Sequence, residues 1–293
     1  MISIFTPVYN RAFILSNLYE SLCRQTDKDF EWIVVDDGST DGIHSLMARF
    51  EEEKKLRIKY ATQKNGGKHR AINNGVKMAE SDYFFIVDSD DFLKDDAVEW
   101  IHSKLSEISD ENRFAGLSGL RVNPDGTKMG REDRFEVIDA NSIEIRTRHH
   151  VTGELAEIYK TDVLRRFPFP EIEGEKFCSE GLVWSRIAES GLILRYYYHP
   201  LIVCEYRSDG LTVNRDKTRM RSPEYSMLLY SERIKGKLVP FREKIKSSLL
   251  FWRFSVGSSH SFLKKAGMLP WFGVPFCLPG MAWGFFTLRK EKK

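Results

Sequence analysis

The sequence has few cysteines and no strong excess of charge of one sign. Its four cysteines, Cys23, Cys178, Cys204 and Cys277, lie far apart, with no CxxC pair and no histidines at zinc-finger spacing. This pattern excludes a cysteine-based zinc site and favours reduced thiols in the cytoplasm. The 45 basic residues nearly balance the 42 acidic ones, giving a formal net charge of +3, so a broad nucleic-acid-binding surface is not expected.

The common phosphate-binding motifs are also missing. In NGGKHR, residues 65–70, His69 stands where a P-loop requires Ser or Thr, and no GxGxxG opens the first predicted helix. These absences exclude a P-loop hydrolase and a dinucleotide enzyme of the usual pattern. The opening MISIFTPVYNR has one short apolar run that stops at Pro7, with no basic segment before it, so we interpret it as a first strand and not as a signal peptide.

The first third of the chain alternates regularly between strand and helix patterns. Short apolar runs at 2–6, 31–37, 56–61 and 83–87 are each followed by apolar residues at helical spacing. Four such units in succession predict an α/β fold in which a mostly parallel, Rossmann-like sheet is covered by helices on both faces. Ligands of such open sheets bind beyond the carboxyl ends of the strands.

Polar loops follow all four predicted strands. They read TPVYNR, DDGSTD, QKNGGKHR and DSDD in chain order. Each alone is typical of an ordinary turn or helix cap. Because the carboxyl ends of parallel strands meet at one edge of a sheet, the four loops together predict a binding site there.

The fourth loop carries Asp88, Asp90 and Asp91 within four residues. Carboxylates this close raise one another's pKa unless a cation neutralises them. Oxygen ligands select Mg²⁺ or Mn²⁺, which complete their coordination with water and phosphate oxygens, so the loop predicts a metal and a phosphate substrate. Lys68 begins the third helix and would lie near a diphosphate. The alternative is an exposed acidic helix N-terminus.

The polar loops and the strands before them resemble one protein family. TPVYNR, VVDDGSTD, NGGKHRAINNGV and DYFFIVDSDDFL together resemble the inverting GT-A-fold glycosyltransferases of family two, which transfer a sugar from a nucleotide diphosphate-sugar. The resemblance is strong over 1–120 and looser to about 214. It implies a catalytic domain at 1–215, with a nucleotide-sugar-binding half at 1–120 and an acceptor half at 121–215, followed by a C-terminal helical region at 216–293.

The resemblance also implies roles for individual residues. The nucleobase pocket would be lined by Thr6, Pro7, Tyr9 and Asn10. Asp37 would accept a hydrogen bond from the base, and Asp36 would be structural. Asp88 would begin the DxD pattern, Asp90 would face the ribose and the metal, and Asp91 would be the most direct metal ligand.

Transfer further requires a general base for the acceptor hydroxyl and a cation near the leaving diphosphate. By resemblance the base is Glu180, in GEKFCSEGLVWSRI, with Glu175 as the alternative; Gly181 stands where the family commonly has a second acidic residue. Lys68 would lie near the diphosphate. Arg207, in EYRSDGLT, would close over it.

These implications predict a metal-dependent transferase, with Mn²⁺ or Mg²⁺ as cofactor. The donor would be a nucleotide diphosphate-sugar, most commonly UDP-linked in the family, and the acceptor a glycan or lipid-linked glycan in surface polysaccharide synthesis. A catalytically silent nucleotide-binding protein is the alternative function. A nucleotidyltransferase is disfavoured, because TPVYNR lacks the Gly-rich basic loop of those enzymes.

The C-terminal region contains a long uncharged segment. Residues 266–288 hold no charged residue and are flanked by basic residues on both sides. Their length would span a bilayer, but Pro270, Pro275 and Pro279 argue against a spanning helix. The aromatic content instead predicts an interfacial or re-entrant segment at the inner face of the plasma membrane. The alternative is a segment packed against the protein's own apolar surface.

Overall fold

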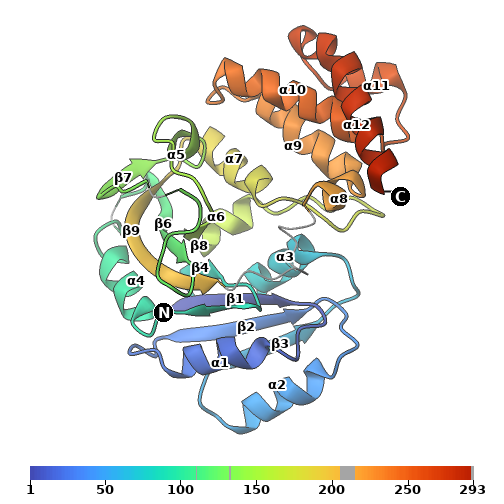
Figure 1. The fold of residues 1–293 in the computed structure, drawn as a ribbon. Coiled ribbons are helices and arrows are strands. Elements are labelled where there is room, and N and C mark those ends of the chain that lie inside the picture. The colour runs from blue at the N-terminus through green and yellow to red at the C-terminus, as the bar shows by residue number, and fades with distance from the viewer. Residues whose placement is uncertain (110, 132, 205–214, 292–293) are drawn as a thin grey trace. The chain divides into compact units, whose positions relative to one another are not determined.

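The computed structural model describes residues 1–109, 111–131, 133–204 and 215–291. The chain folds as two compact units (Figure 1). Unit 1 is Met1–Pro168 with Ser190–Tyr206, and unit 2 is Phe169–Glu189 with Arg207–Lys293. Residues 1–215, predicted as the catalytic domain, therefore cover all of unit 1, the first segment of unit 2 and the beginning of its second segment.

Unit 1 is built on a mixed sheet. Among the described residues, its order is β3-β2-β1-β4-β8-β6-β9-β5, with β7 paired to β9. The parallel half contains the four predicted strands: β1 (Ile2–Val8), β2 (Phe30–Asp36), β3 (Ile58–Thr62) and β4 (Tyr83–Ile86). In the register of the sheet, Val8 pairs with Asp36 and Asp36 pairs with Thr62. The loops after β1, β2 and β3 therefore leave the sheet side by side, as predicted.

The other half of the sheet comes from later strands. They are β5 (Asp91–Leu93), β6 (Phe114–Val122), β7 (Val137–Ala140), β8 (Leu155–Lys160) and β9 (Ile193–Cys204). β8 is antiparallel to β4, and β5 is antiparallel to β9, where Asp91 pairs with Cys204. The sequence predicted a loop running from the acidic residues directly to a helix, so the short strand β5 is a correction: Asp91 lies in the sheet.

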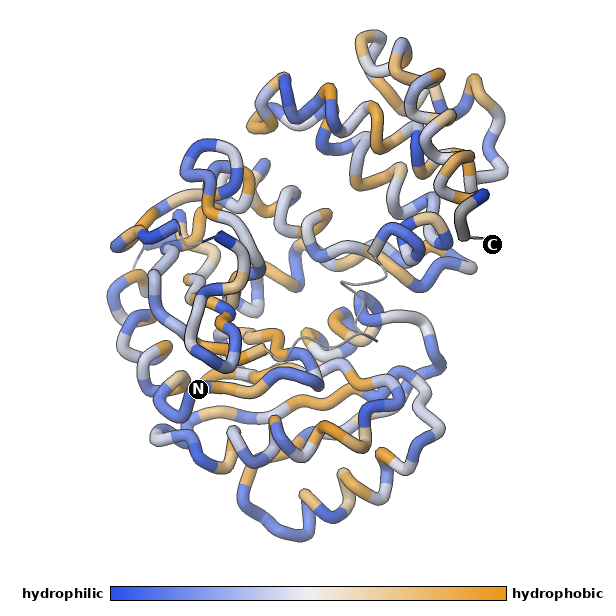
Figure 2. Tube along the Cα trace, in the orientation of Figure 1, coloured by the Kyte–Doolittle hydropathy of each residue, from blue (hydrophilic) through white to orange (hydrophobic). Residues whose placement is uncertain are grey.

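Helices cover both faces of the sheet in unit 1, which confirms the predicted fold class. They are α1 (Leu15–Cys23), α2 (Ile43–Glu52), α3 (Lys68–Met78), α4 (Ala97–Leu105), α5 (Glu144–Thr147) and α6 (Thr161–Arg166). Successive strand residues point to opposite faces. Ile4 accordingly joins the core cluster formed with Leu18 of α1 and Met47 of α2, whereas Phe5 packs against Gly75 of α3. Hydrophobic residues follow the central strands (Figure 2).

Unit 2 is helical within its described residues. It contains α7 (Gly181–Glu189), α8 (Arg215–Met220), α9 (Pro223–Lys235), α10 (Phe241–Ser255), α11 (Phe262–Gly267), the 3-10 helix η1 (Trp271–Phe276) and α12 (Cys277–Glu291). α10 packs against α9 on one side and α12 on the other. Pro279 lies in the first turn of α12, where a helix does not use the backbone N–H. By length and composition, Trp271–Arg289 is the one described segment able to cross a membrane, and 17% of it is buried.

Candidate active site

The loops after β1 and β2 are joined by hydrogen bonds. Asn10, which has a left-handed backbone with φ 52°, donates its N–H to Ser39 Oγ (2.8 Å) and accepts from the Thr40 N–H (2.8 Å) through Oδ1. Of the residues predicted to line a nucleobase pocket, Tyr9 has a side chain that is 51% exposed, whereas Thr6 is fully buried and its hydroxyl accepts from Trp32 Nε1 (2.9 Å). The Tyr9 ring is thus exposed at this edge of the sheet, whereas the Thr6 side chain is buried and bonded to Trp32.

Asp37 holds the loop between β3 and α3. Its Oδ1 accepts from Gln63 Nε2 and the Gly66 N–H (both 2.7 Å), and its Oδ2 accepts from the Gly67 N–H (2.7 Å) and Asn65 Nδ2 (3.2 Å). Only 4% of Asp37 is exposed. Gly67 has φ 99°, a conformation that other L-residues rarely adopt. Asp37, predicted to bind the base, therefore fixes the loop that leads into Lys68.

Asp36 is structural, as the resemblance implied. It is 1% exposed, and its Oδ1 accepts from the Ser39 N–H (2.9 Å). The hydroxyl of Tyr60 donates to its Oδ2 at 3.4 Å. Burial raises the pKa of Tyr60, and the neighbouring charge of Asp36 adds to that rise. The paired aspartates at the end of β2 thus hold two different loops in place.

The acidic loop is gathered with two cations. Lys68 Nζ lies 2.6 Å from Asp88 Oδ1, and Arg121 Nη1 lies 2.6 Å from Asp91 Oδ2 and 3.4 Å from Asp88 Oδ2. Asp91 is 5% exposed and Arg121 is 9% exposed. We call Lys68, Asp88, Asp91 and Arg121 the charge cluster. It brings the start of α3, the end of β4, β5 and β6 to one place.

The two aspartates of the charge cluster differ in pKa. Burial alone would raise the pKa of Asp88, but the charges of Lys68 and Arg121 hold it down, to about 2. Burial raises the pKa of Asp91 to about 7, because desolvation and the nearby charges of Asp88 and Asp90 outweigh the attraction of Arg121. Of the two, Asp88 therefore keeps its negative charge to lower pH than Asp91.

Arg121 was missed as a site residue from the sequence, which placed it only at the start of the acceptor half at 121–215. The structure places it in β6, whose nine residues are all buried. An arginine inside the otherwise apolar FAGLSGLRV is a signal that sequence reading could have used, since a buried guanidinium requires an acidic partner. The like charges that predicted a metal are thus neutralised in part by the protein's own cations.

The geometry of the acidic loop limits which side chains could hold a divalent metal. Within the described ranges, no group of three or more His, Cys, Asp or Glu side chains is arranged to hold a metal ion. Mg²⁺ and Mn²⁺ sites at phosphates, however, use only one or two carboxylates. Asp90 is half-buried and has no ion-pair partner among the described residues, whereas Asp91, the predicted direct ligand, already accepts from Arg121. The donor set fits a metal bound at Asp90 together with substrate phosphates.

The two candidate bases both lie in unit 2 and differ in their surroundings. Glu175 is 7% exposed, and its oxygens accept from the N–H groups of Glu224 (2.7 Å) and Tyr225 (2.8 Å) at the start of α9. Burial raises its pKa, although these two bonds oppose the rise. Glu180 is half-buried and immediately precedes α7, and its backbone carbonyl accepts from the Val183 and Trp184 N–H groups. Glu175 thus caps helix α9. Arg207, the predicted diphosphate contact, lies outside the described residues.

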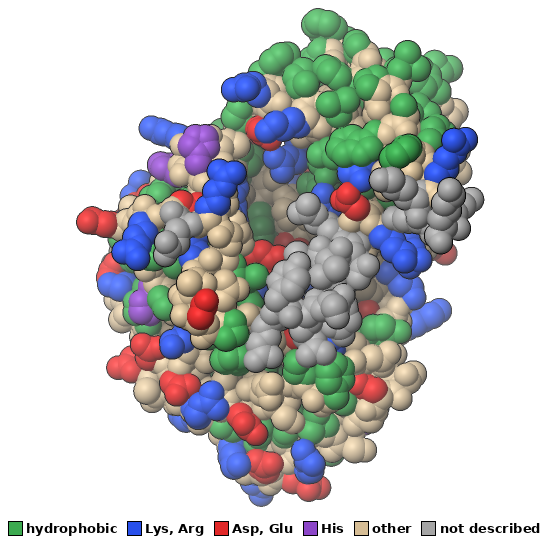
Figure 3. Space-filling view, viewed as in Figure 1, with side chains coloured by type: hydrophobic (Ala, Val, Ile, Leu, Met, Phe, Trp, Pro, Cys, Tyr) green, Lys and Arg blue, Asp and Glu red, His purple; other side chains and the backbone are tan. Residues whose placement is uncertain are grey.

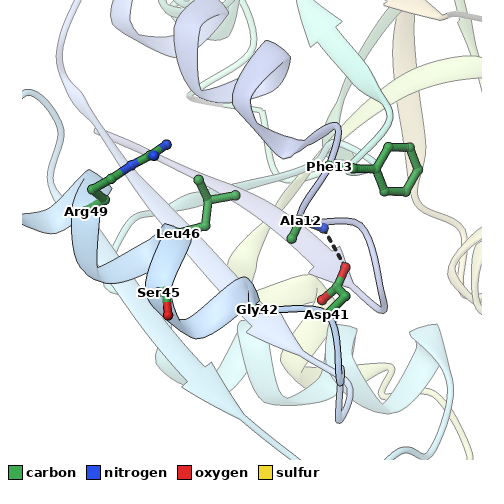
Figure 4. Close-up of a pocket in the computed structure, with 7 residues that line it drawn as sticks. All are labelled: Ala12, Phe13, Asp41, Gly42, Ser45, Leu46 and Arg49. Carbon is green, nitrogen blue, oxygen red and sulfur yellow. Dashed lines mark hydrogen bonds between the residues drawn. The ribbon is translucent and has the colours of Figure 1, made fainter.

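A separate cavity lies beside the first two loops of unit 1. Its volume is about 460 Å³, and it is open to solvent between the start of α1 and the N-terminal half of α2 (Figure 4). Its lining residues are Ala12, Phe13, Asp41, Gly42, Ser45, Leu46 and Arg49. Asp41 accepts from the Ala12 N–H at 2.8 Å. None of the predicted site residues lines this cavity.

Comparisons with known proteins show which family the sequence is similar to. The family model described as Glycosyl transferase family 2 matches residues 3–168. Glycosyltransferase GlyG of Streptococcus pneumoniae serotype 4 is 34% identical over 108 residues, which is 36% of this chain and 36% of that protein. An uncharacterized glycosyltransferase of Haemophilus influenzae is 29% identical over 183 residues, 60% of this chain and 69% of that protein. Against four curated relatives, the matched segment spans only 15% to 36% of their length.

Solved structures share the fold. Residues 1–349 of Staphylococcus aureus TarS, in complex with UDP-GlcNAc, align with a TM-score of 0.65 and 20% identity, over 95% of this chain and 79% of that one. The mannosyltransferase PcManGT of Pyrobaculum calidifontis, in complex with GDP-Man and Mn²⁺, aligns with a TM-score of 0.58 and 18% identity, over 97% and 83%. With a family model that matches more than half of its length, the chain belongs to glycosyltransferase family 2.

Proposed function

We propose that this protein transfers a sugar from a nucleotide diphosphate-sugar to a hydroxyl group of a glycan acceptor, with inversion at the anomeric carbon. The observation that carries the proposal is the charge cluster at the carboxyl edge of a parallel sheet. It joins Lys68, at the start of a helix, to Asp88 at 2.6 Å. Helix N-termini and lysines bind phosphate, and carboxylates beside them bind divalent cations, so the edge has the chemistry that a sugar nucleotide needs.

In the proposed reaction, Lys68 binds the diphosphate and Asp90 faces the metal and the ribose. A bound Mn²⁺ or Mg²⁺ would neutralise charge on the departing nucleotide diphosphate. Arg121 contacts both Asp88 and Asp91 and is proposed to position them. Tyr9 offers a ring to the nucleobase, while Asp37 keeps the 63–67 loop in shape.

Glu180 is proposed as the general base. It takes the proton of the acceptor hydroxyl as that oxygen forms a bond to the anomeric carbon, and the bond from that carbon to the diphosphate breaks. Its half-buried position immediately before α7 supports this role, and the Glu175 carboxylate is proposed to serve instead as the cap of α9. Arg207 remains a proposed diphosphate contact.

The acceptor is proposed to be a surface polysaccharide or its lipid-linked precursor, used at the inner face of the plasma membrane. Two relatives support this class: TarS of Staphylococcus aureus is named a poly(ribitol-phosphate) beta-N-acetylglucosaminyltransferase, and GgaB of Bacillus subtilis a minor teichoic acid biosynthesis protein. UDP-sugars are the first donors to test, since a TarS structure is a complex with UDP-GlcNAc. A silent nucleotide-binding protein is the alternative.

The test is a panel of UDP- and GDP-sugars, each with and without Mn²⁺, measured by calorimetric binding and by release of free nucleotide. A donor that binds with Mn²⁺ and slowly releases its nucleotide supports the transferase, whereas binding without any release supports the silent protein. Asp90→Asn should lower kcat/KM at least about a hundred-fold, equivalent to about 2.7 kcal/mol.

The matched control is Asp95→Asn. Asp95 is five residues further along and forms an exposed ion pair with Arg24 at 3.1 Å, so its loss should change kcat/KM by less than about two-fold. If Asp90→Asn and Asp95→Asn retain equal activity at limiting Mn²⁺, the role proposed for Asp90 is wrong.

A further inference from the structure

The surface of unit 2 carries an unusual amount of exposed apolar area. Nine of the thirteen large hydrophobic side chains that are exposed in the described chain lie at or after Leu238. Hydrophobic side chains gather over the C-terminal unit in Figure 3. Five of them, in α11, η1 and α12, are more than half exposed: Leu263 (82%), Trp271 (84%), Leu278 (79%), Phe285 (51%) and Phe286 (59%). We call these five residues the apolar face.

Close packing against α10 explains why Leu278, Phe285 and Phe286 of α12 are left exposed. A Cβ at Gly280 would lie 2.5 Å from the Cβ of Trp252, and a Cβ at Gly284 would lie 2.2 Å from the carbonyl oxygen of Arg253. Only glycine fits at these two positions. An ordinary surface helix turns its apolar stripe inward. α12 instead turns glycines inward, so its leucine and aromatic residues are left on the outer side.

Cations flank the apolar segment in the sequence. Lys264 and Lys265 precede Trp271, and Arg289 and Lys290 follow Phe286, whereas Glu243 and Glu291 lie just outside residues 244–290 and Lys246 is paired with Glu243 at 2.6 Å. Lys246, Lys264 and Arg289 are exposed. An apolar surface edged by cations suits anionic headgroups above a hydrocarbon layer. A second copy of the same surface would bring these cations against one another, which disfavours self-association through it.

Several contacts tie η1 and α12 to the rest of unit 2. The Arg253 guanidinium lies 4.1 Å from the ring centre of Trp283 and donates to Asp216 at 2.7 Å. Trp252 Nε1 donates to the carbonyl of Gly273 at 3.0 Å. A crossing helix would have to break these contacts.

We propose that the apolar face inserts into one leaflet of an anionic lipid membrane and that the segment lies in the interface without crossing it. The inference goes beyond the proposed transfer reaction and depends on neither its donor nor its base. It would hold the protein at the surface where a lipid-linked acceptor is located.

The test is sedimentation of the full chain with vesicles of neutral phosphatidylcholine and with vesicles that also contain about one third phosphatidylglycerol. Binding is expected mainly to the anionic vesicles at low salt, and 1 M NaCl should release the protein, because salt screens the headgroup contribution. Trp271→Ser and Phe285→Ser should each lower the partition coefficient about 5- to 30-fold.

Phe13→Ser is the matched control, since Phe13 of unit 1 is a phenylalanine with more exposure (65%) than Phe285 (51%). Its partitioning should equal that of the unmodified chain. Point substitutions are preferable to a truncation, which would uncover Trp252. Nucleotide binding measured on the same samples separates a failed membrane proposal from a failed transferase proposal.

Three results would overturn the inference. If the protein binds both vesicle types equally and neither substitution changes that binding, the apolar face is not the membrane-binding surface. Retention on vesicles in 1 M NaCl and alkaline carbonate would indicate a spanning segment. Without vesicles, light scattering should report a monomer; a dimer that Trp271→Ser dissociates would assign the face to a second copy.

Discussion

Arg121→Met offers a quantitative test of the charge cluster. The Arg121 and Asp91 side chains are 10% and 7% exposed, and they meet at 2.6 Å. Removing one partner of a buried ion pair leaves the other charge without compensation, which costs about 3–5 kcal/mol. Asp88 loses only a 3.4 Å contact and keeps Lys68, so Asp91 should account for most of the loss.

The loss should depend on pH. The pKa of Asp91 is raised to about 7 in the folded protein, and removing the attraction of Arg121 should raise it further. A carboxyl group with a raised folded pKa binds more protons when folded than when unfolded. Stability therefore falls as pH rises from the unfolded value toward the folded pKa. The variant continues to lose stability above pH 7, so its deficit should be larger at pH 8 than at pH 6.

The assay is guanidinium unfolding at pH 6 and pH 8. Arg195→Met is the control, because Arg195 pairs with Asp139 at 2.7 Å on a more exposed surface and should cost less than about 1 kcal/mol. Asp91→Asn added to Arg121→Met should recover much of the loss at pH 8. The reasoning would be refuted if the free energy of unfolding of Arg121→Met at pH 8 lay within about 0.5 kcal/mol of that of the unmodified protein. It would also be refuted if the loss of stability did not grow with pH.

Further predictions concern other parts of the chain. Glu180→Gln should bind donor normally and lose about two to four orders of magnitude in turnover, measured by nucleotide release; the base is misassigned if turnover persists. Glu175→Gln should lower the free energy of unfolding by about 1–3 kcal/mol and leave kcat nearly unchanged, because its buried carboxylate caps α9. Gly75→Ala should cost about 1–3 kcal/mol, since the new Cβ would lie 2.3 Å from an aromatic ring, whereas Gly267→Ala, with nothing within 4 Å, should be neutral in the same denaturation assay. Burial would raise the pKa of Glu31, but its ion pair and hydrogen bonds hold that pKa below the usual value. The Glu31 carboxylate therefore stabilises the fold above about pH 4.5, and this stabilisation is lost as the pH falls through the folded pKa. The free energy of unfolding of Glu31→Gln should depend less on pH between 5 and 3 than that of the unmodified protein. An equal dependence would contradict this.

The nucleotide-binding half was predictable from the sequence because its signals are local. The apolar runs of β1 to β4 and the helical spacing after them need no knowledge of distant residues. Parallel strands then fix where the loops lie, since their carboxyl ends share one edge. The polar loops after β1, β2 and β3 could be assigned to one side of the sheet on that basis alone, and the register of Val8, Asp36 and Thr62 confirms it.

The partners of these residues were decided only by the tertiary structure. Arg121 is 30 residues from Asp91, and Glu175 is 49 from the first N–H it caps, so no local pattern joins them. Asp37 could be identified as a site residue, but its four bonds to the 63–67 loop depend on how that loop closes.

The C-terminal segment shows the same division. Its composition determined that residues 266–288 are apolar and have basic flanks, which is a property of the sequence alone. The direction in which the side chains point was decided by packing. Gly280 and Gly284 let α12 approach α10 more closely than any other residue allows, and that contact leaves Leu278 and Phe285 on the outside. Sequence determined what the segment contains, and the close approach of two helices determined which part of it faces outward.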